Sequence, residues 1–200
     1  MQTSHPKFSA AILAGGKNSR MNGENKALLK LGNSTILEMQ LKVLSEIFDD
    51  IILVGKGFAK NTGYRIVEDI IPDKGPLSGI HAALSYSKND FVFVISCDMP
   101  FLSADFIKIL LREASECRYD AVVPNHKNGI EPLHAVYRKT IIKNAEEVLS
   151  QKDNRIRNMF NGIKIEYFDV NLHYNTEIIF FNINCPEDLE KAQYYAKRNY

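Results

Sequence analysis

Apolar residues along this chain follow two patterns: short unbroken runs, and longer stretches in which they recur at helical spacing. The unbroken runs at residues 8–14, 51–54 and 91–95 predict strands of a parallel sheet, because such strands are buried on both faces. Shorter or mixed runs predict further strands at residues 64–67, 120–124, 133–137, 164–168 and 178–183.

Helices are predicted between most of these strands. Ser34 or Thr35 together with Glu38 has the pattern of a capping box, and it predicts a helix that continues to residue 48. Pro76 suits the first position of a helix over residues 76–86, and Ser103 suits the cap of a helix reaching residue 114. The remaining helices are predicted at residues 140–149, within residues 152–160, and from residue 186 onward.

This alternation of strands and helices predicts an α/β protein with three layers, α/β/α, around a mostly parallel sheet. A length of 200 residues suits a single domain covering residues 1–200. Ligands of such open sheets bind beyond the carboxyl ends of the strands. The functional residues of this chain are therefore expected directly after its predicted strands.

Composition and charge narrow the classes of function. The formal net charge of +1 argues against nucleic acid as a partner, because nucleic-acid-binding domains are usually strongly basic. Cys97, Cys117 and Cys185 are odd in number and contain no Cys-x-x-Cys pair, which argues against a disulfide framework and a zinc knuckle. These features are typical of a protein of the reducing cytoplasm.

Neither a signal peptide nor a membrane span is expected. Residues 1–7 lead into the first predicted strand without an extended apolar segment. The longest apolar runs, at residues 91–95 and 178–181, are far shorter than the about 18 residues that a membrane helix needs. We therefore expect a cytoplasmic protein that makes no contact with membranes.

The segment after the first predicted strand has the composition of an anion-binding loop. Gly15 and Gly16 carry no Cβ, so a ligand can approach their backbone N–H groups. Lys17, Arg20 and Lys26 follow within the same loop and add positive charge. Backbone donors and cations together at the end of a strand indicate a site for a polyphosphate.

The loop matches neither of two common phosphate-binding motifs. A P-loop requires a hydroxyl residue directly after its Gly-Lys pair, and the residues after Gly23 do not provide that arrangement. The dinucleotide fingerprint Gly-x-Gly-x-x-Gly is also absent from residues 15–20. The loop therefore belongs to a third kind of phosphate site.

Two motifs resemble those of a known family. Leu13-Ala-Gly-Gly-Lys-Asn-Ser-Arg-Met21, followed by Lys26, is similar to the signature loop of nucleotidyltransferases and most closely to that of molybdenum-cofactor guanylyltransferases. Cys97-Asp98-Met-Pro100 resembles the second motif of the same family. The resemblance covers residues 11–189 and implies the Rossmann-like fold of these nucleotidyltransferases.

The chain departs from the family pattern inside the loop. Asn22 precedes Gly23, which displaces the glycine by one position, and Asn25 stands before Lys26 where relatives carry an acid. The lysine itself is in place. Gly55 stands where some relatives carry an asparagine that contacts the nucleotide.

The resemblance implies a reaction as well as a fold. It implies transfer of GMP from GTP to the phosphate of molybdopterin with Mg²⁺, which yields the guanine dinucleotide cofactor and pyrophosphate. The implied partners are GTP, the molybdenum cofactor and proteins that mature molybdoenzymes. Two alternatives remain open: a cytidylyltransferase acting on a phosphorylated acceptor, and a nucleotide-binding accessory protein without catalysis.

Three residues are candidates for the catalytic centre. Asp98 follows the most apolar predicted strand, where it can bind Mg²⁺ or can simply turn the chain ahead of Pro100. Lys26 can contact the triphosphate or can be a solvated surface lysine. The resemblance favours Asp98 as catalytic metal ligand, with Lys26 and Arg20 as catalytic cations.

The resemblance implies a larger nucleotide-binding set. Asp69 can contact the nucleotide or occupy an ordinary turn, and residues 75–79 can meet the ligand with backbone donors or merely start a helix. The full set expected at the nucleotide is Leu13, Ala14, Gly15, Gly16, Lys26, Asp69, Gly75, Pro76, Gly79 and Asp98.

Acceptor binding is assigned to two further groups. Arg155 and Arg157 belong to a basic run whose guanidinium groups suit phosphate, although an exposed helix face would look the same. Asn182 and Asn184 alternate along the predicted last strand, so both amides should point to one side, with helix capping by Asn184 as the alternative. His134 lies in a stretch that resembles the acceptor cleft, but we assign it no role as a base.

Overall fold

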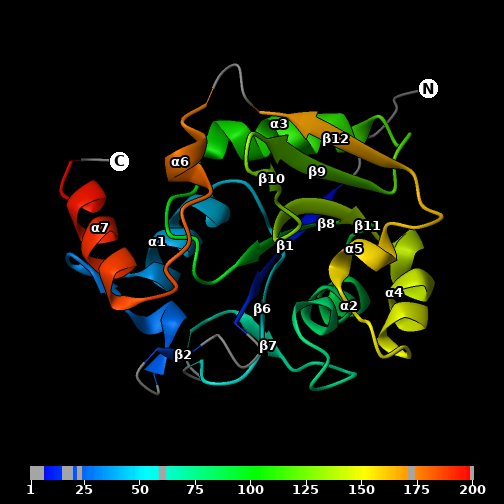
Figure 1. Ribbon diagram of the computed structural model, residues 1–200, viewed down its shortest axis with the longest axis horizontal. Helices are drawn as coiled ribbons and strands as arrows, with labels where there is room; N and C mark the ends of the chain where they lie inside the picture. The colour runs from blue at the N-terminus through cyan, green and yellow to red at the C-terminus, as the bar shows by residue number, and fades with distance from the viewer. Residues whose placement is uncertain (1–6, 15–19, 22–23, 59–61, 171–173, 199–200) are drawn as a thin grey trace.

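The computed structural model describes residues 7–14, 20–21, 24–58, 62–170 and 174–198 (Figure 1). The strands of the main sheet are β1 (Phe8–Leu13), β6 (Ile51–Val54), β7 (Arg65–Val67), β8 (Phe91–Ser96), β9 (Ala121–His126), β10 (Gly129–Ile130), β11 (His134–Arg138) and β12 (Ile165–Asp169). Within the described ranges these eight strands follow the order β10-β9-β11-β8-β1-β6-β7, and β12 pairs with β9.

Most of the sheet is parallel, as predicted. β1 lies at its centre and pairs in parallel with β6 and β8, with Ala10 opposite both Ile51 and Phe93. β11 runs antiparallel to both β8 and β9, so β9 points the same way as β8. The carboxyl ends of β1, β6, β8 and β9 therefore meet at one edge of the sheet.

Two short hairpins lie outside the main sheet. β2 (Arg20–Met21) pairs with β3 (Glu24–Asn25), and β4 (Lys30–Leu31) pairs with β5 (Ser34–Thr35). A 3₁₀ turn, η1 (Lys26–Leu28), separates the two hairpins. This short turn carries Lys26, so its geometry decides where that lysine points.

The helices follow the predicted order. They are α1 (Ile36–Ser45), α2 (Pro76–Tyr86), α3 (Ala104–Ser115), the 3₁₀ turn η2 (Lys139–Ile141), α4 (Ile142–Leu149), α5 (Ile156–Met159), α6 (Thr176–Ile179) and α7 (Pro186–Ala196). The capping box of α1 forms as expected between Thr35 and Glu38, with Thr35 N–H donating to Glu38 Oε2 at 2.7 Å. α1 ends at Ser45, earlier than residue 48.

In the described part of the chain, no helix is both long and apolar enough to span a bilayer.

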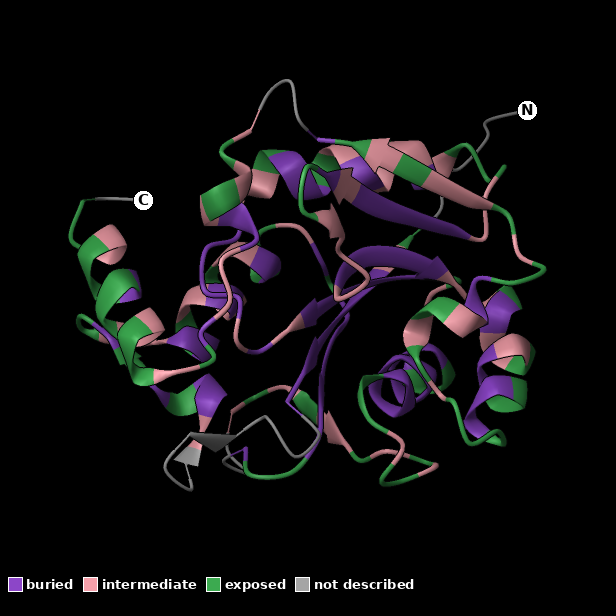
Figure 2. Cartoon of the chain, viewed as in Figure 1, coloured by how far each residue is buried: buried purple, intermediate pink, exposed green. Residues whose placement is uncertain are grey.

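The two faces of the sheet are covered by different helices, which confirms the three-layer prediction. α1 and α3 pack on one face, and their largest buried side chains there are Leu37, Leu44, Phe106 and Leu110. α2, α4 and α5 pack on the other face, with Leu77, Ile80, Ala145, Leu149 and Met159. Figure 2 shows the central strands buried almost along their whole length between these layers.

A third apolar cluster, which the sequence did not indicate, lies beside α1. It joins Leu31 of β4, Ile36 of α1 and Phe101 to Ile183 and Ala192, the last of which is in α7. α7 and β4 are thus neighbours although they are far apart in the sequence (Figure 1). The C-terminal helix closes the protein on this side.

The predicted strand at residues 178–183 is wrong. Residues 176–179 form α6, and no strand follows before α7. The apolar run misled the prediction because a short buried run fits a strand and an irregular buried segment equally well. In the fold, Phe180 packs edge-on against Phe106 of α3, so this run is buried by side chains and not by sheet neighbours.

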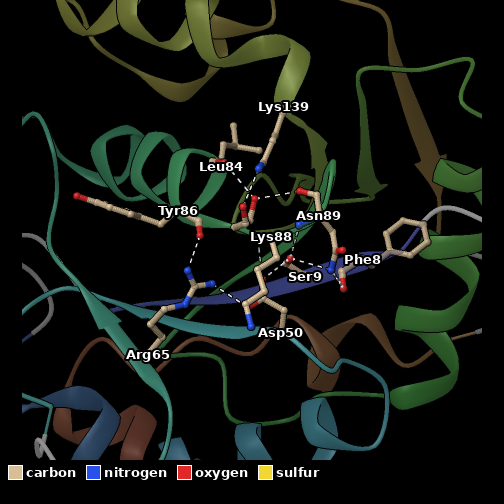
Figure 3. Close-up of polar contacts among 10 residues, drawn as sticks. Phe8, Ser9, Asp50, Arg65, Leu84, Tyr86, Lys88, Asn89 and Lys139 are labelled. Atoms are coloured by element: carbon tan, nitrogen blue, oxygen red, sulfur yellow. Dashed lines mark hydrogen bonds and ion pairs between the residues drawn. The ribbon is translucent and has the colours of Figure 1, made fainter.

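A polar network ties the strands together at the edge where β1, β6, β7 and β8 begin (Figure 3). Asp50, which is buried, accepts hydrogen bonds from Ser9 Oγ at 2.6 Å, from Lys88 N–H at 2.9 Å and from Arg65 Nη2 at 2.8 Å. Asn89 Nδ2 donates to Phe8 O at 2.9 Å. Burial works to raise the pKa of Asp50, but these hydrogen bonds and the charge of Arg65 outweigh it and hold the pKa below its ordinary value.

Candidate active site

Asp98 lies in a tight turn directly after β8, at the edge where the parallel strands end. Met99 N–H donates to Ser96 O at 3.3 Å and closes this turn around Asp98. Cys97 N–H donates to Leu13 O at 2.9 Å, which ties the turn to the end of β1. The backbone of Asp98 is therefore held close to the end of the strand that leads into the glycine loop.

Lys26 meets Asp98 at this edge. The Lys26 side chain is only 4% exposed, and its Nζ lies 3.7 Å from Asp98 Oδ2. The same Nζ donates to Asn184 Oδ1 at 3.1 Å. A buried ammonium group is costly unless it is paired, so these two oxygens stabilise its position. Three of the predicted residues, from three distant parts of the chain, are thus in direct contact.

Asn25, where the resemblance in sequence leads us to expect an acid, holds the backbone next to Lys26. Its Oδ1 accepts the N–H of Ala27 at 3.0 Å and caps η1. An aspartate can accept the same hydrogen bond, because both side chains carry an oxygen at that position. The replacement by an amide therefore preserves the local geometry that directs Lys26 toward Asp98.

The oxygens around Lys26 fit a divalent cation of the magnesium type. Asp98 Oδ1 is buried and has no hydrogen-bond partner among the described residues, although Asp98 as a whole keeps 18% of its side chain exposed. Asn184 contributes a second oxygen within reach of the same ammonium group. Mg²⁺ prefers oxygen ligands and is often held by one or two protein groups together with substrate phosphates. Within the described ranges, no cluster of three or more His, Cys, Asp or Glu side chains forms a closed metal site.

Asp69 lies after β7, at the same edge of the sheet. Its Oδ1 is buried and has no partner in the part of the chain that the structure describes. Burial, together with the nearby charges of Asp73 and Glu68, raises the pKa of this carboxyl group above its ordinary value. A buried acceptor without a partner is expensive in a folded protein, so Asp69 is suited to accept a hydrogen bond from a ligand.

The first turn of α2 faces this edge as well. Gly75 has φ 73° and ψ −159°, a conformation that essentially only glycine adopts, and Pro76 occupies the first helical position. A Cβ at Gly79 would lie 3.1 Å from Leu13 Cδ1, so α2 packs closely against the end of β1. Ala14 N–H donates to Val54 O at 2.8 Å and extends the β1 pairing toward the loop.

Part of the predicted loop lies outside the residues that the structure describes. Gly15, Gly16 and Lys17 lie outside the described residues. Arg20 belongs to β2, but its side chain also lies outside what the structure describes. The roles predicted for these residues stay predictions.

The two predicted acceptor-binding amides are arranged differently from the expectation. With no strand at residues 178–183, Asn182 and Asn184 do not share one side of a strand. Asn182 Nδ2 donates to Phe180 O at 3.0 Å, a local contact, whereas Asn184 contacts Lys26. Asp188 Oδ2 accepts the N–H of Asn184 at 2.9 Å, so the start of α7 fixes the position of Asn184.

The two predicted acceptor-binding arginines also differ. Arg155 forms a bidentate pair with Asp153, at 2.8 Å from Nε and 2.6 Å from Nη2, and this pair lowers the pKa of Asp153. Arg157 is exposed, and its Nη2 lies 3.9 Å from the position that a Cβ on Gly129 would occupy. Arg157 therefore reaches β10, whereas the charge of Arg155 is already balanced.

Neither the histidine nor the thiol nearest to these residues is suited to proton transfer at neutral pH. His134 is completely buried between Phe93, Phe106 and Phe180, and burial lowers its pKa to about 3. Burial raises the pKa of Cys97 to about 12, and the adjacent Asp98 adds to this effect. The imidazole is therefore neutral and the thiol protonated, in agreement with the expectation that His134 is not a base.

Gln40 belongs to this region but was not indicated by any sequence pattern. It lies on the buried face of α1, where its spacing from Leu37 and Leu44 made it look like part of an ordinary helix face. In the fold its amide contacts the turn that carries Asp98. The one signal for Gln40 in the sequence is a polar residue at a helix position where the spacing predicts an apolar one.

Comparisons with known proteins give a consistent result. The family model described as MobA-like NTP transferase domain matches residues 10–167. A probable molybdenum cofactor guanylyltransferase of Pelotomaculum thermopropionicum is 36% identical over 197 residues, covering 96% of this chain and 94% of the relative. One from Clostridium perfringens is 37% identical over 191 residues, covering 92% and 95%. The crystal structure of molybdopterin-guanine dinucleotide biosynthesis protein A from Archaeoglobus fulgidus superposes with a TM-score of 0.82 at 25% identity, covering 95% of this chain and 99% of that one.

Proposed function

Because this chain belongs to the MobA-like NTP transferase family, we propose that it transfers GMP from GTP to the phosphate of molybdopterin. An oxygen of the acceptor phosphate bonds to the α-phosphorus of GTP, the bond from the α-phosphorus to the oxygen that bridges to the β-phosphate breaks, and pyrophosphate leaves. The products are the guanine dinucleotide form of the cofactor and pyrophosphate. The printed names of the relatives and the solved neighbour support this choice of nucleotide and acceptor.

The contact of Lys26 with Asp98 and Asn184 is the observation that carries the proposal. An ionised phosphate is already a nucleophile, so the main barrier is to bring two polyanions together and to stabilise negative charge in line with the leaving group. Lys26 provides a fixed cation for the phosphate oxygens, at a position where burial strengthens its effect. The neutral His134 and the protonated Cys97 have no step to perform.

Asp98, with Asn184 as the second oxygen, would hold Mg²⁺ in this enzyme. Asp98 Oδ1 supports this assignment, because it is buried without a partner among the described residues and a metal ion would provide one. When bound, the ion supplies positive charge to the phosphate oxygens. Asp98 and Asn184 themselves hold the Lys26 ammonium group in place, and this group would contact the phosphate oxygens.

The remaining residues divide between the two substrates. Asp69 accepts a hydrogen bond from the nucleotide, and the first turn of α2, from Gly75 to Gly79, places backbone donors beside it. Arg157 is the better candidate for the acceptor phosphate, because Arg155 is already paired with Asp153. A cytoplasmic location and contact with molybdoenzyme-maturation proteins stay predictions.

Replacing Asp98 tests the metal role. We expect Asp98→Ala to remain folded and to lower nucleotide transfer at least about 100-fold, because it removes the charge that positions the cation. Transfer is measured as pyrophosphate release and as dinucleotide by mass spectrometry. Asp49→Ala, an exposed acid before β6 at the other edge of the sheet, is the control. Near-normal transfer by the Asp98 variant would contradict the role.

A second assay tests the nucleotide. The wild-type protein is incubated with molybdopterin, Mg²⁺ and one of GTP, CTP or ATP. The proposal requires dinucleotide and pyrophosphate with GTP and much less of both with the other two. A preference for CTP would make the protein a cytidylyltransferase, and GTP binding without pyrophosphate release would make it an accessory protein.

A further inference from the structure

The turn that carries Asp98 is held at both ends by a single side-chain amide. Gln40 Nε2 on α1 donates to Ser96 O at 2.8 Å and to Met99 O at 2.9 Å. Ser96 and Met99 are the first and last residues of the turn, and Asp98 lies between them. Because both partners are carbonyl oxygens, which only accept, the orientation of the amide is unambiguous.

Gln40 is an unusual residue for its place. It is completely buried on the face of α1 that otherwise presents Ile36, Leu37 and Leu44 to the core. Its Oε1 is buried and has no hydrogen-bond partner among the described residues. A helix that only needed to fill the core would be served by leucine or methionine there, without leaving a buried acceptor unsatisfied. The two donated hydrogen bonds are therefore the property that distinguishes glutamine at this position.

Three backbone hydrogen bonds also tie the turn to its surroundings. Ser96 N–H donates to Leu133 O at 3.0 Å, Cys97 N–H donates to Leu13 O at 2.9 Å, and Ile183 N–H donates to Asp98 O at 2.9 Å. Gln40 adds a side-chain contact to the carbonyl oxygens at both ends of the turn and connects them to α1, a capped helix. The direction of the Asp98 carboxylate relative to Lys26 and Asn184 depends on these contacts together.

We propose that Gln40 is a positioning residue for the reaction: it holds the turn at residues 96–99 so that the Asp98 carboxylate meets the metal ion beside Lys26. The proposal rests on the metal-binding role of Asp98 in the proposed function. Residues behind metal ligands commonly change metal affinity or activity by about 10- to 100-fold when they are replaced. Gln40 would act on the proposed metal ligand Asp98 in this way, through its hydrogen bonds to the backbone of the turn.

Gln40→Met is the main test, with Leu44→Met as the matched control. Methionine is close to glutamine in shape but donates no hydrogen bond, and Leu44 is equally buried on the same helix but has no hydrogen-bonding side chain. The affinity for Mn²⁺ is measured by electron paramagnetic resonance, which detects the free ion, in the presence of a nonhydrolysable GTP analogue. A sample of Mn²⁺ with the analogue but without protein is the reference. The Mg²⁺ concentration for half-maximal pyrophosphate release and the melting temperature are measured in parallel.

We expect Gln40→Met to weaken Mn²⁺ binding by about 10-fold or more and to raise the Mg²⁺ requirement similarly, while metal-free binding of the analogue stays as in Leu44→Met. Mn²⁺ affinity equal to that of the control overturns the proposal. If wild type and Asp98→Ala bind Mn²⁺ equally, the metal role in the proposed function fails first. These two failures are therefore distinguishable.

Gln40→Leu is a second variant, for the case in which Gln40→Met does not fold. Leucine is apolar and donates no hydrogen bond to the carbonyls of the turn. We expect its Mn²⁺ affinity to be about 10-fold or more below that of Leu44→Met. An affinity equal to that of the control in either folded variant overturns the proposal.

Discussion

At the scale of single residues, two aspartates show how a fully paired carboxylate differs from the one that we propose binds the metal ion. Asp50 is buried at one edge of the sheet with both oxygens bonded, to Ser9, Arg65 and the backbone of Lys88. Asp98, at the opposite edge, keeps one buried oxygen without a partner among the described residues. In the sequence, both residues are acids next to an apolar run. Only their hydrogen-bond partners in the fold distinguish them.

Asp50 leads to a prediction about stability and pH. Its folded-state pKa is below the ordinary value of about 3.9, so ionised Asp50 stabilises the fold above that pH and the stabilisation disappears as the pH falls through the folded-state pKa. We expect Asp50→Asn to lower the free energy of unfolding by about 2 kcal/mol at neutral pH. The deficit should shrink below about pH 4.

Urea unfolding of Asp50→Asn and wild type across this pH range measures the effect. The exposed neighbour Asp49→Asn serves as the control and should change stability little. A deficit that is constant from neutral to acid pH would show that the charge of Asp50 is not what the network stabilises.

At the scale of elements, the start of α2 is fixed by backbone conformation and not by a side-chain cap. Gly75 caps α2 with φ 73°, and no side-chain hydrogen bond is made there. A Cβ added to Gly75 would meet no atom of the described residues within 4 Å, so the expected effect of a substitution comes from the backbone. The position of the first turn of α2, at the edge where the parallel strands end, therefore depends on glycine.

Gly75→Ala tests this dependence. We expect it to cost about 1–3 kcal/mol of stability and to weaken GTP binding at least about tenfold, because the first turn of α2 must shift to relieve the strain. Gly162→Ala is the matched control: Gly162 has φ 81° and open space, but it precedes β12, at the edge where that strand starts. Calorimetric titration with GTP separates the two variants. Equal loss of affinity in both would mean that the effect is general destabilisation.

At the scale of the whole molecule, α7 completes both a core and the candidate site. Ala192 of α7 covers Leu31, Ile36 and Phe101, and Asp188 at the start of the helix holds the backbone of Asn184. Each large apolar side chain buried in such a cluster contributes about 1.5–3 kcal/mol. The C-terminal helix thus connects stability to the position of a residue that contacts Lys26.

Truncation tests the role of α7. We expect a chain ended after Asn184 to expose the third cluster, to bind a hydrophobic dye and to lose cooperative thermal unfolding. A chain ended after Arg198 keeps the helix and should melt like wild type. Calorimetry and dye fluorescence measure both. An unchanged melting temperature in the shorter chain would contradict the assignment of α7 to the core.

The sequence by itself determined the features that depend on neighbours in the chain. The apolar runs at β1, β6 and β8, the capping box at Thr35 and the proline start of α2 all arise from local patterns, and all appear in the structure. The family motifs likewise singled out Lys26 and Asp98. Local propensity and burial periodicity are encoded in short segments, so they can be read without the fold.

Tertiary structure alone decided what these segments meet. In place of the strand expected at residues 178–183, the fold has the end of α6 and a partly buried irregular segment. The fold also brought Asn184 to Lys26, paired Arg155 with Asp153, and placed Gln40 behind Asp98. Each of these contacts joins groups by distance and desolvation in three dimensions. Hydrogen-bond partners and burial are properties of the packed chain, and a linear pattern of residues does not contain them.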